Sequence, residues 1–129
     1  MICTIIRRGG GRVRRLQGKH AYAAVFAFKC RVAGRQLHIY GRPNGISDAR
    51  LGVIVGKRLM PRAVDRNYCK RLVREMFRRE CGALKGFDFV VRLQSGALPR
   101  PQTVRVELRE LLSGLLRKCG DREPVVDHG

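Results

Sequence analysis

The stretch from residue 63 to residue 81 limits the possible folds of this chain more than any other, because its two sides have opposite character. Each residue of an α-helix turns by about 100°, so four apolar residues of this stretch fall within roughly 80° of Cys69. An apolar stripe of this kind predicts a long helix that packs one side against a sheet. The four apolar residues are Leu72, Val73, Met76 and Phe77.

The other side of the same stretch is a basic row with a single asparagine. Solvated helix faces usually mix charge signs, because opposite charges four residues apart stabilise a helix and like charges repel. Here, between Lys57 and Arg79, nine basic residues face two acidic ones, and the whole chain carries a net charge of +18. The row therefore favours a nucleic-acid-binding surface over a bland solvated face. Its members are Arg66, Asn67, Lys70, Arg71, Arg74 and Arg78.

The rest of the chain divides into further periodic segments separated by glycine and proline. We expect helices over about 18–28 and 102–118, and strands over 30–33, 36–41, 51–55 and 87–91. The order helix, three strands, helix, strand, helix predicts one α+β sandwich domain. Residues 1–15 read as a basic flexible arm, residues 16–118 as the RNA-binding domain, and residues 119–129 as a polar tail.

The cysteines and the apolar runs bear on the compartment. Cys3, Cys30, Cys69, Cys81 and Cys119 are scattered, with no CxxC pair and no zinc-ligand spacing. We interpret them as reduced thiols, each a small buried hydrophobe, in a cytoplasmic protein. No apolar run approaches the roughly 20 residues of a membrane span, so no membrane partner is expected. The N-terminus also lacks the charge order of a signal peptide.

Catalytic patterns are missing from the sequence. A protein nuclease needs clustered carboxylates or paired histidines, and here the acids are scattered. The nearest pair, Glu107 and Glu110, is interpreted as making surface ion pairs. His38 alternates with Leu37 and Ile39, so it faces the other side of its strand, either lining a groove or incidentally. No helix-turn-helix or zinc-finger spacing points to DNA.

Two segments together resemble the bacterial ribonuclease P protein family. They are Arg-Leu-Gly-Val-Ile-Val-Gly-Lys-Arg at 50–58 and Ala-Val-Asp-Arg-Asn-Tyr-Cys-Lys-Arg-Leu-Val-Arg-Glu at 63–75. The family signature is an Arg-Asn-Arg-x-x-Lys-Arg-like helix after an Arg-x-Gly strand that ends in two basic residues, and the resemblance covers about 16–118. Tyr68 replaces the second arginine, which either removes a phosphate contact or supplies a stacking ring. Arg62 replaces an asparagine N-cap, and Asp65 compensates through the helix dipole.

The resemblance implies a fold and a function. The fold is a four-stranded mixed sheet packed with three helices in αβββαβα order, with a left-handed βαβ crossover that departs from the usual hand. The implied function is the protein subunit of ribonuclease P. Such a subunit binds the catalytic RNA subunit and the 5′ leader of precursor tRNA and assists endonucleolytic removal of the leader. The catalytic centre is then in the RNA, which also binds most of the Mg²⁺, and the protein holds no metal or cofactor of its own.

The resemblance also implies two sets of contact residues. The resemblance implies a leader groove between the sheet and a helix; core packing is the other interpretation for Tyr22, Phe26 and Tyr40. Lys57 and Arg58 end a strand, so at least one of them can face the groove. The alternative function is a structural ribosomal RNA-binding protein of similar fold. The RNA-subunit set is Arg62, Arg66, Asn67, Lys70, Arg71, Arg74 and Arg78, and the leader set is Tyr22, Phe26, Tyr40, Arg50, Lys57 and Arg58.

Overall fold

The computed structural model describes residues 13–81 and 86–119, which form one sheet and three helices. The helices agree with the predicted segments, and the long one has the expected bounds. In chain order the elements are β1 (Val13–Arg15), α2 (Lys19–Phe28), β2 (Arg31–Ala33), β3 (Leu37–Pro43), β4 (Ala49–Ile54), α3 (Ala63–Cys81), β5 (Phe87–Leu93) and α4 (Pro101–Cys119).

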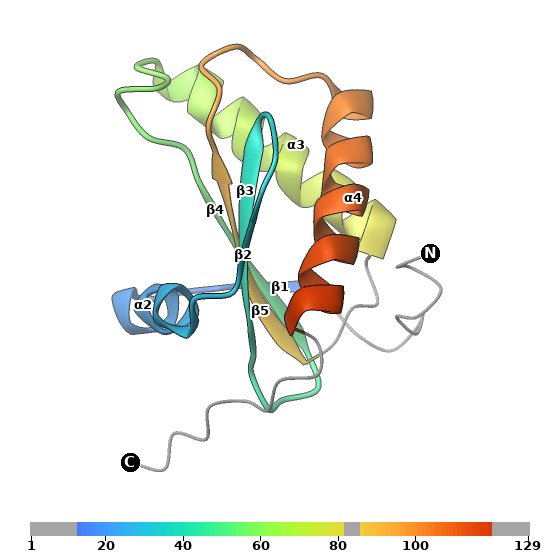
Figure 1. The fold of residues 1–129 in the computed structure, drawn as a ribbon. Coiled ribbons are helices and arrows are strands. Elements are labelled where there is room, and N and C mark those ends of the chain that lie inside the picture. The colour runs from blue at the N-terminus through green and yellow to red at the C-terminus, as the bar shows by residue number, and fades with distance from the viewer. Residues whose placement is uncertain (1–12, 82–85, 120–129) are drawn as a thin grey trace.

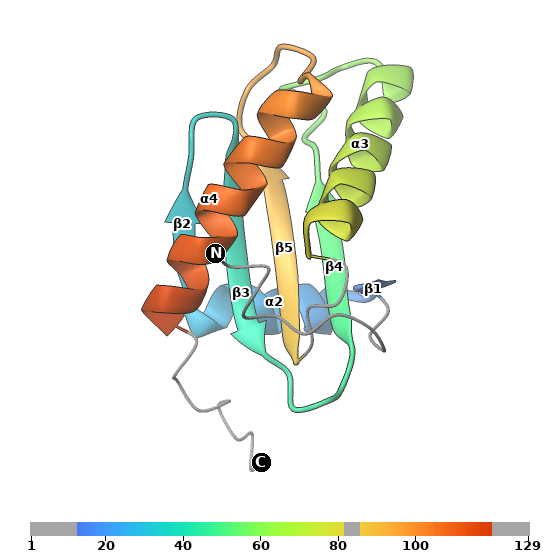
Figure 2. The same ribbon diagram turned by 90° about the vertical axis from the view of Figure 1, so that its right-hand side faces the viewer.

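The sheet has five strands in the order β1-β4-β5-β3-β2, one more than the sequence predicts. β4 is parallel to both β1 and β5, while β3 is antiparallel to β5 and β2. In Figure 2, α3 lies in front of the sheet, β4 and β5 both point upward, and β5 lies to the left of β4. The connection from β4 through α3 to β5 is therefore left-handed, as expected, against the common rule for parallel strands.

The fifth strand comes from the segment interpreted as the basic arm. Val13 pairs with Ala49 and Arg15 with Leu51, and the Leu16 amide donates to the Leu51 carbonyl (3.0 Å). Three residues are too few to show the alternation that identifies a strand, and two of the three are arginines. The rest of the predicted arm, 1–12, and the tail beyond Cys119 lie outside the described residues.

One face of the sheet carries the main core. Figure 1 views the sheet edge-on, with α3 and α4 together on one side and α2 alone on the other. Strand residues that point toward α3 and α4 are buried, among them Ile39, Leu51 and Phe89. α4 contributes Leu108, Leu112 and their neighbours, and α3 contributes the apolar stripe expected from its wheel: Cys69, Val73, Met76 and Phe77 are buried, and Leu72 packs against them.

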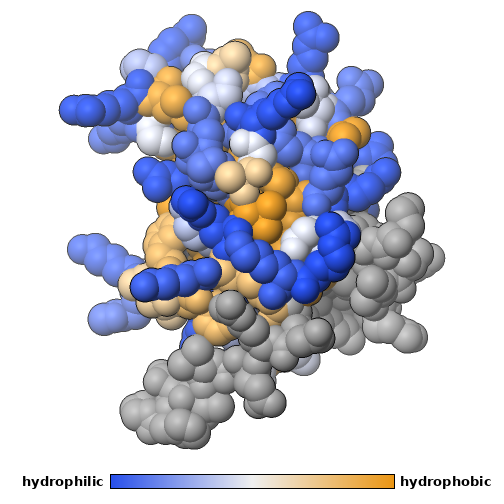
Figure 3. Space-filling view, in the orientation of Figure 1, coloured by the Kyte–Doolittle hydropathy of each residue, from blue (hydrophilic) through white to orange (hydrophobic). Residues whose placement is uncertain are grey.

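The opposite face is covered only where α2 lies. Val25 of α2 packs with Leu16 and Val90 in a small second cluster of buried side chains. Figure 3, in the orientation of Figure 1, shows apolar surface gathered over α2 and near the centre, with hydrophilic side chains around it. We call this α2-bearing side of the sheet the open face.

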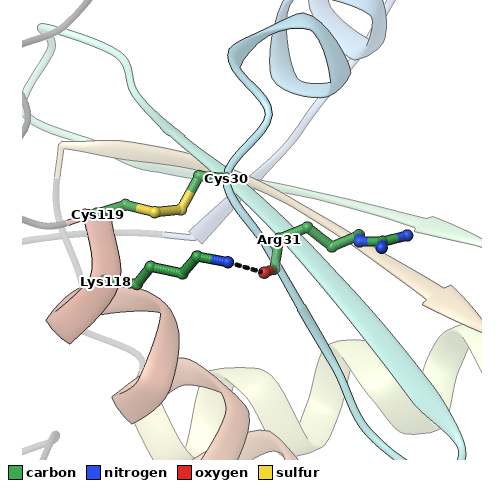
Figure 4. The surroundings of a disulfide bond; sticks show 4 residues. All are labelled: Cys30, Arg31, Lys118 and Cys119. Atoms are coloured by element: carbon green, nitrogen blue, oxygen red, sulfur yellow. Dashed lines mark hydrogen bonds between the residues drawn. A yellow bond between two sulfur atoms is a disulfide. The ribbon is translucent and has the colours of Figure 1, made fainter.

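A disulfide joins Cys30, just before β2, to Cys119 at the end of α4, across 89 residues of sequence (Figure 4). The interpretation of these two cysteines as reduced thiols was wrong, although both are buried as expected. Two residues so far apart in sequence give no pairing signal, and only the packing of α4 along β2 and β3 brings them together. Next to the bond, Lys118 donates to the Arg31 carbonyl (3.2 Å). Cys69 is free and buried, as expected.

None of the helices within the described residues is long and apolar enough to span a membrane.

Candidate nucleic-acid interface

The basic row of α3 extends from the edge of the buried stripe to the outer side of the helix. Arg62, Asn67, Arg71 and Arg78 are exposed, whereas Lys70 and Arg74 are half-buried. Glu75 accepts hydrogen bonds from Arg79 and Arg78 (2.8 Å each), and these bonds lower its pKa. The acid thus neutralises charge at the C-terminal end of the row, and the middle of the row keeps its excess of cations.

Arg66 has a structural role that the sequence did not reveal. Its guanidinium donates to the carbonyls of Met60 (2.9 Å) and Pro61 (2.8 Å), and the amides of Asp65 and Arg66 donate to the Arg62 carbonyl (3.1 Å each). The side chain therefore fastens the incoming loop to the first turn of α3, where the asparagine N-cap of the family is absent. Asp65 lies in that first turn, where a negative charge suits the helix dipole.

Tyr68 departs from the signature and links α3 to the loop before α4. Its side chain is exposed, and its hydroxyl donates to the Pro99 carbonyl at 3.5 Å, a long hydrogen bond. The ring therefore lies on the outer surface near the start of both helices, with one side open.

On the open face, three aromatic residues lie where α2 meets the sheet. The rings of Phe26 and Tyr40 pack edge to face with centroids 4.7 Å apart. The ring of Tyr22 lies directly over Gly52, where any larger residue would collide with it. All three are half-buried and pack beside the second cluster. All three side chains therefore pack against the sheet and are also partly exposed.

Arg50, predicted in the leader set, is engaged within the protein. Its Nε and Nη2 donate to the two carboxylate oxygens of Asp88 (2.7 and 2.8 Å), which raises the pKa of Arg50 against the opposing effect of burial. Asn44 donates to the same carboxylate (2.8 Å). Asp88 is 1% exposed, so this pair is a structural anchor between β4 and β5.

Lys57 and Arg58 do not end a strand, so the argument from alternating strand faces fails. β4 ends at Ile54, and both residues lie in a turn that the Met60 amide closes on the Gly56 carbonyl (3.0 Å). The connection between β4 and α3 bends toward the same side of the sheet as α2 (Figure 1). Both side chains are exposed in that turn.

The structure places two arginines, Arg31 and Arg92, near His38, and the sequence analysis had not identified either of them as a candidate. His38 is opposite Arg92 in the register of β3 and β5, and Arg31 of β2 is close by. Burial first, and then these two arginines, lower the pKa of His38. The alternation of Arg92 between Val91 and Leu93 is a signal for an outward-facing residue. This group continues the open face beyond the aromatic rings.

Several of the described acidic residues make structural contacts. Glu107 accepts the backbone amides of Gln36 (2.8 Å) and Leu37 (2.7 Å), so it fastens α4 to the β2–β3 hairpin beyond the surface role expected of it. Asp48 pairs with Arg14 (2.9 Å). Within 13–81 and 86–119, no group of three or more His, Cys, Asp or Glu residues is arranged to hold a metal ion.

The sequence was also compared with models of known protein families. The model described as ribonuclease P matches residues 11–119, which is most of the chain. The chain belongs to the ribonuclease P protein family. This confirms the resemblance based on the β4 and α3 segments.

Curated relatives and solved structures agree with this assignment. The ribonuclease P protein component of Chromobacterium violaceum is 35% identical over 108 residues, covering 84% of this chain and 89% of the relative. The structure of the Staphylococcus aureus RNase P protein superimposes with a TM-score of 0.70 at 27% identity, covering 79% and 94% of the two chains. The RNase P protein from Thermotoga maritima gives 0.60 at 30% identity, covering 81% and 96%.

Membership in the ribonuclease P protein family sets the biochemical role. The chain is a protein subunit of the RNA-based endoribonuclease that matures the 5′ ends of tRNAs. The expected fold is confirmed as well, apart from the additional edge strand.

Proposed function

We propose that this subunit binds the ribonuclease P RNA through the outer side of α3 and the 5′ leader of precursor tRNA across the open face. The one-sign row on α3 is the observation that carries the proposal. A helix whose inner side is fixed in the core presents cations as a rigid surface, which suits contacts to phosphates and ribose hydroxyls without reading sequence. The contact residues are Arg62, Asn67, Lys70, Arg71, Arg74 and Arg78, with Arg66 holding the helix start.

The open face supports the leader as its ligand. A single strand has unpaired bases that can stack on Tyr22, Phe26 and Tyr40, and its phosphates can meet the cations of the turn at Lys57 and Arg58. Arg50 contributes mainly by fixing the sheet through Asp88.

The reaction itself is assigned to the RNA subunit, with Mg²⁺ bound mainly by RNA, in the cytoplasm. The described carboxylates Asp88, Glu75 and Glu107 are already hydrogen-bonded within the protein, which supports a binding role for this chain. Its cations release counterions from RNA and reduce repulsion between substrate and catalytic RNA.

Processing of precursor tRNA by the RNA subunit at moderate Mg²⁺, with and without this protein, tests the proposal. We expect clear stimulation, weakened in a Lys70→Ala/Arg71→Ala double variant. Arg35→Ala/Arg100→Ala, which removes equal charge from exposed sites outside α3, is the matched control. Absence of stimulation at every salt concentration, or sedimentation with ribosomal particles in place of the RNA subunit, would overturn the proposal.

A further inference from the structure

A groove separates the edge strand β1 from the C-terminal half of α3. It has a volume of about 290 Å³, with Val13 and Leu51 among its apolar lining residues. This volume is at the low end for ligand sites and fits a phosphate with an attached sugar better than a large ligand. Its polar lining is five arginines and one acid: Arg14, Arg15, Arg71, Arg74, Arg78 and Glu75.

Two of the five arginines are already paired with carboxylates. Arg14 pairs with Asp48 (2.9 Å), and Arg78 donates to Glu75 (2.8 Å). The other three, Arg15, Arg71 and Arg74, have no carboxylate within ion-pair distance among the described residues. Three unneutralised guanidinium groups that line one groove repel one another, and a bound anion would remove that repulsion.

Arg74 gives the second observation. Its Nε is buried and has no hydrogen-bond partner in the described structure. Burial, and then the nearby charge of Arg15, lower the pKa of Arg74. A buried charged donor without an acceptor is costly, so this atom indicates a missing acceptor beside the groove that Arg74 lines.

We propose that this groove binds a backbone phosphodiester of the ribonuclease P RNA, with Arg74 lining it and Arg15 and Arg71 on opposite sides. The proposal rests on the function proposed above and adds β1 to the RNA surface. Guanidinium forks match phosphate oxygens in charge and geometry. Because Arg71, Arg74 and Arg78 belong to both the groove and the basic row, RNA that follows α3 passes over the groove.

Arg15→Ala tests the inference, because Arg15 is exposed, lies on β1 and belongs to no other proposed contact. Binding to the RNA subunit is measured by filter retention over a series of salt concentrations. We expect about tenfold weaker binding and a salt slope reduced by about one, as for loss of one phosphate contact. Arg35→Ala, an exposed arginine on the β2–β3 hairpin, is the matched control and should change neither value appreciably.

Equal effects of Arg15→Ala and Arg35→Ala on affinity and slope would overturn the groove proposal while leaving RNA binding by α3 intact. Failure of the wild-type protein to bind the RNA subunit would instead overturn the proposed function. A parallel titration with inorganic phosphate follows the Arg74 Nε–H signal by NMR. If phosphate shifts that signal but Arg15→Ala leaves RNA affinity unchanged, the groove is a site for free phosphate and the proposal is wrong.

Discussion

The two faces of the sheet differ in what covers them. α3 and α4 bury nearly every strand side chain on one face, so that Leu37, Ile39 and Phe89 are fully enclosed. On the open face, α2 covers one end and leaves aromatic rings half-buried beside a group of cations. The face covered by α3 and α4 holds the main core and therefore supplies most of the stability. The open face holds only the small second cluster, so its remaining apolar and charged surface is available to a ligand.

The largest effect is expected from the covered face. Phe77→Ala removes a fully buried ring that packs against Phe89 (centroids 5.4 Å apart) and should cost about 3–5 kcal/mol of unfolding free energy. Phe26→Ala removes the same ring from the half-buried position on the open face and should cost clearly less. Urea unfolding measures both. Equal losses of unfolding free energy in the two variants would contradict the conclusion that the covered face supplies most of the stability.

The ion pair between buried Asp88 and half-buried Arg50 on the open face comes next. Asp88→Ala leaves half-buried Arg50 and Asn44 without their shared acceptor and should cost about 2 kcal/mol, since the hydrogen bonds to this buried carboxylate are lost. Asp48→Ala breaks the more exposed pair with Arg14 and should cost about 0–1 kcal/mol. Thermal unfolding of the two variants compares them. A small loss for Asp88→Ala would show that the pair does not anchor the sheet.

A third change should alter binding more than folding. Tyr22→Ala should weaken binding of leader-bearing precursor tRNA by about 1–3 kcal/mol, the value of one base–aromatic stack, and leave mature tRNA little changed. Gly52→Ala should reproduce part of this loss, because its methyl group displaces the Tyr22 ring. Competition binding with precursor and mature tRNA is the measurement. Equal losses for both RNAs would place the leader elsewhere.

The smallest effect concerns His38 and pH. Its lowered pKa means that the unfolded chain binds the proton more readily than the folded chain. The unfolding free energy should therefore decrease as pH falls from about 6.5 through the lowered folded value, because burial first, and then the nearby Arg31 and Arg92, disfavour the charged ring. Unfolding followed between about pH 7.5 and about pH 5.5, with His38→Gln as the reference, measures this contribution. A steeper pH dependence in His38→Gln would contradict it.

The local sequence pattern predicted most helices and strands. The contacts between residues far apart in the sequence depend on tertiary packing and could not be predicted. The bounds of α3 could be predicted from the apolar stripe around Cys69, because the spacing of apolar residues in a long amphipathic helix identifies its buried side. β1 was not predicted, because three residues are too few to show the alternation of apolar and polar side chains that identifies a strand. The ion pair between Arg50 and Asp88 was not predicted, because the two residues are 38 positions apart and meet only through the parallel register of β4 and β5. Residue types thus indicated an RNA-binding protein, whereas the tertiary fold decided which cations remain available.

The disulfide closes the chain into a covalent ring. The ring runs from Cys30 to Cys119 and contains β2, β3, β4, α3, β5 and α4. β1 and α2 precede Cys30 and are therefore not part of the covalent ring. A backbone cut anywhere inside the ring would leave one molecule until the bond is reduced. A cut between α2 and Cys30 would instead release Tyr22, Phe26 and Arg15 together. Among the described elements, only β1 and α2 can be lost with the covalent ring left whole, and they carry Tyr22 and Phe26 of the proposed leader surface and Arg15 of the proposed phosphate groove.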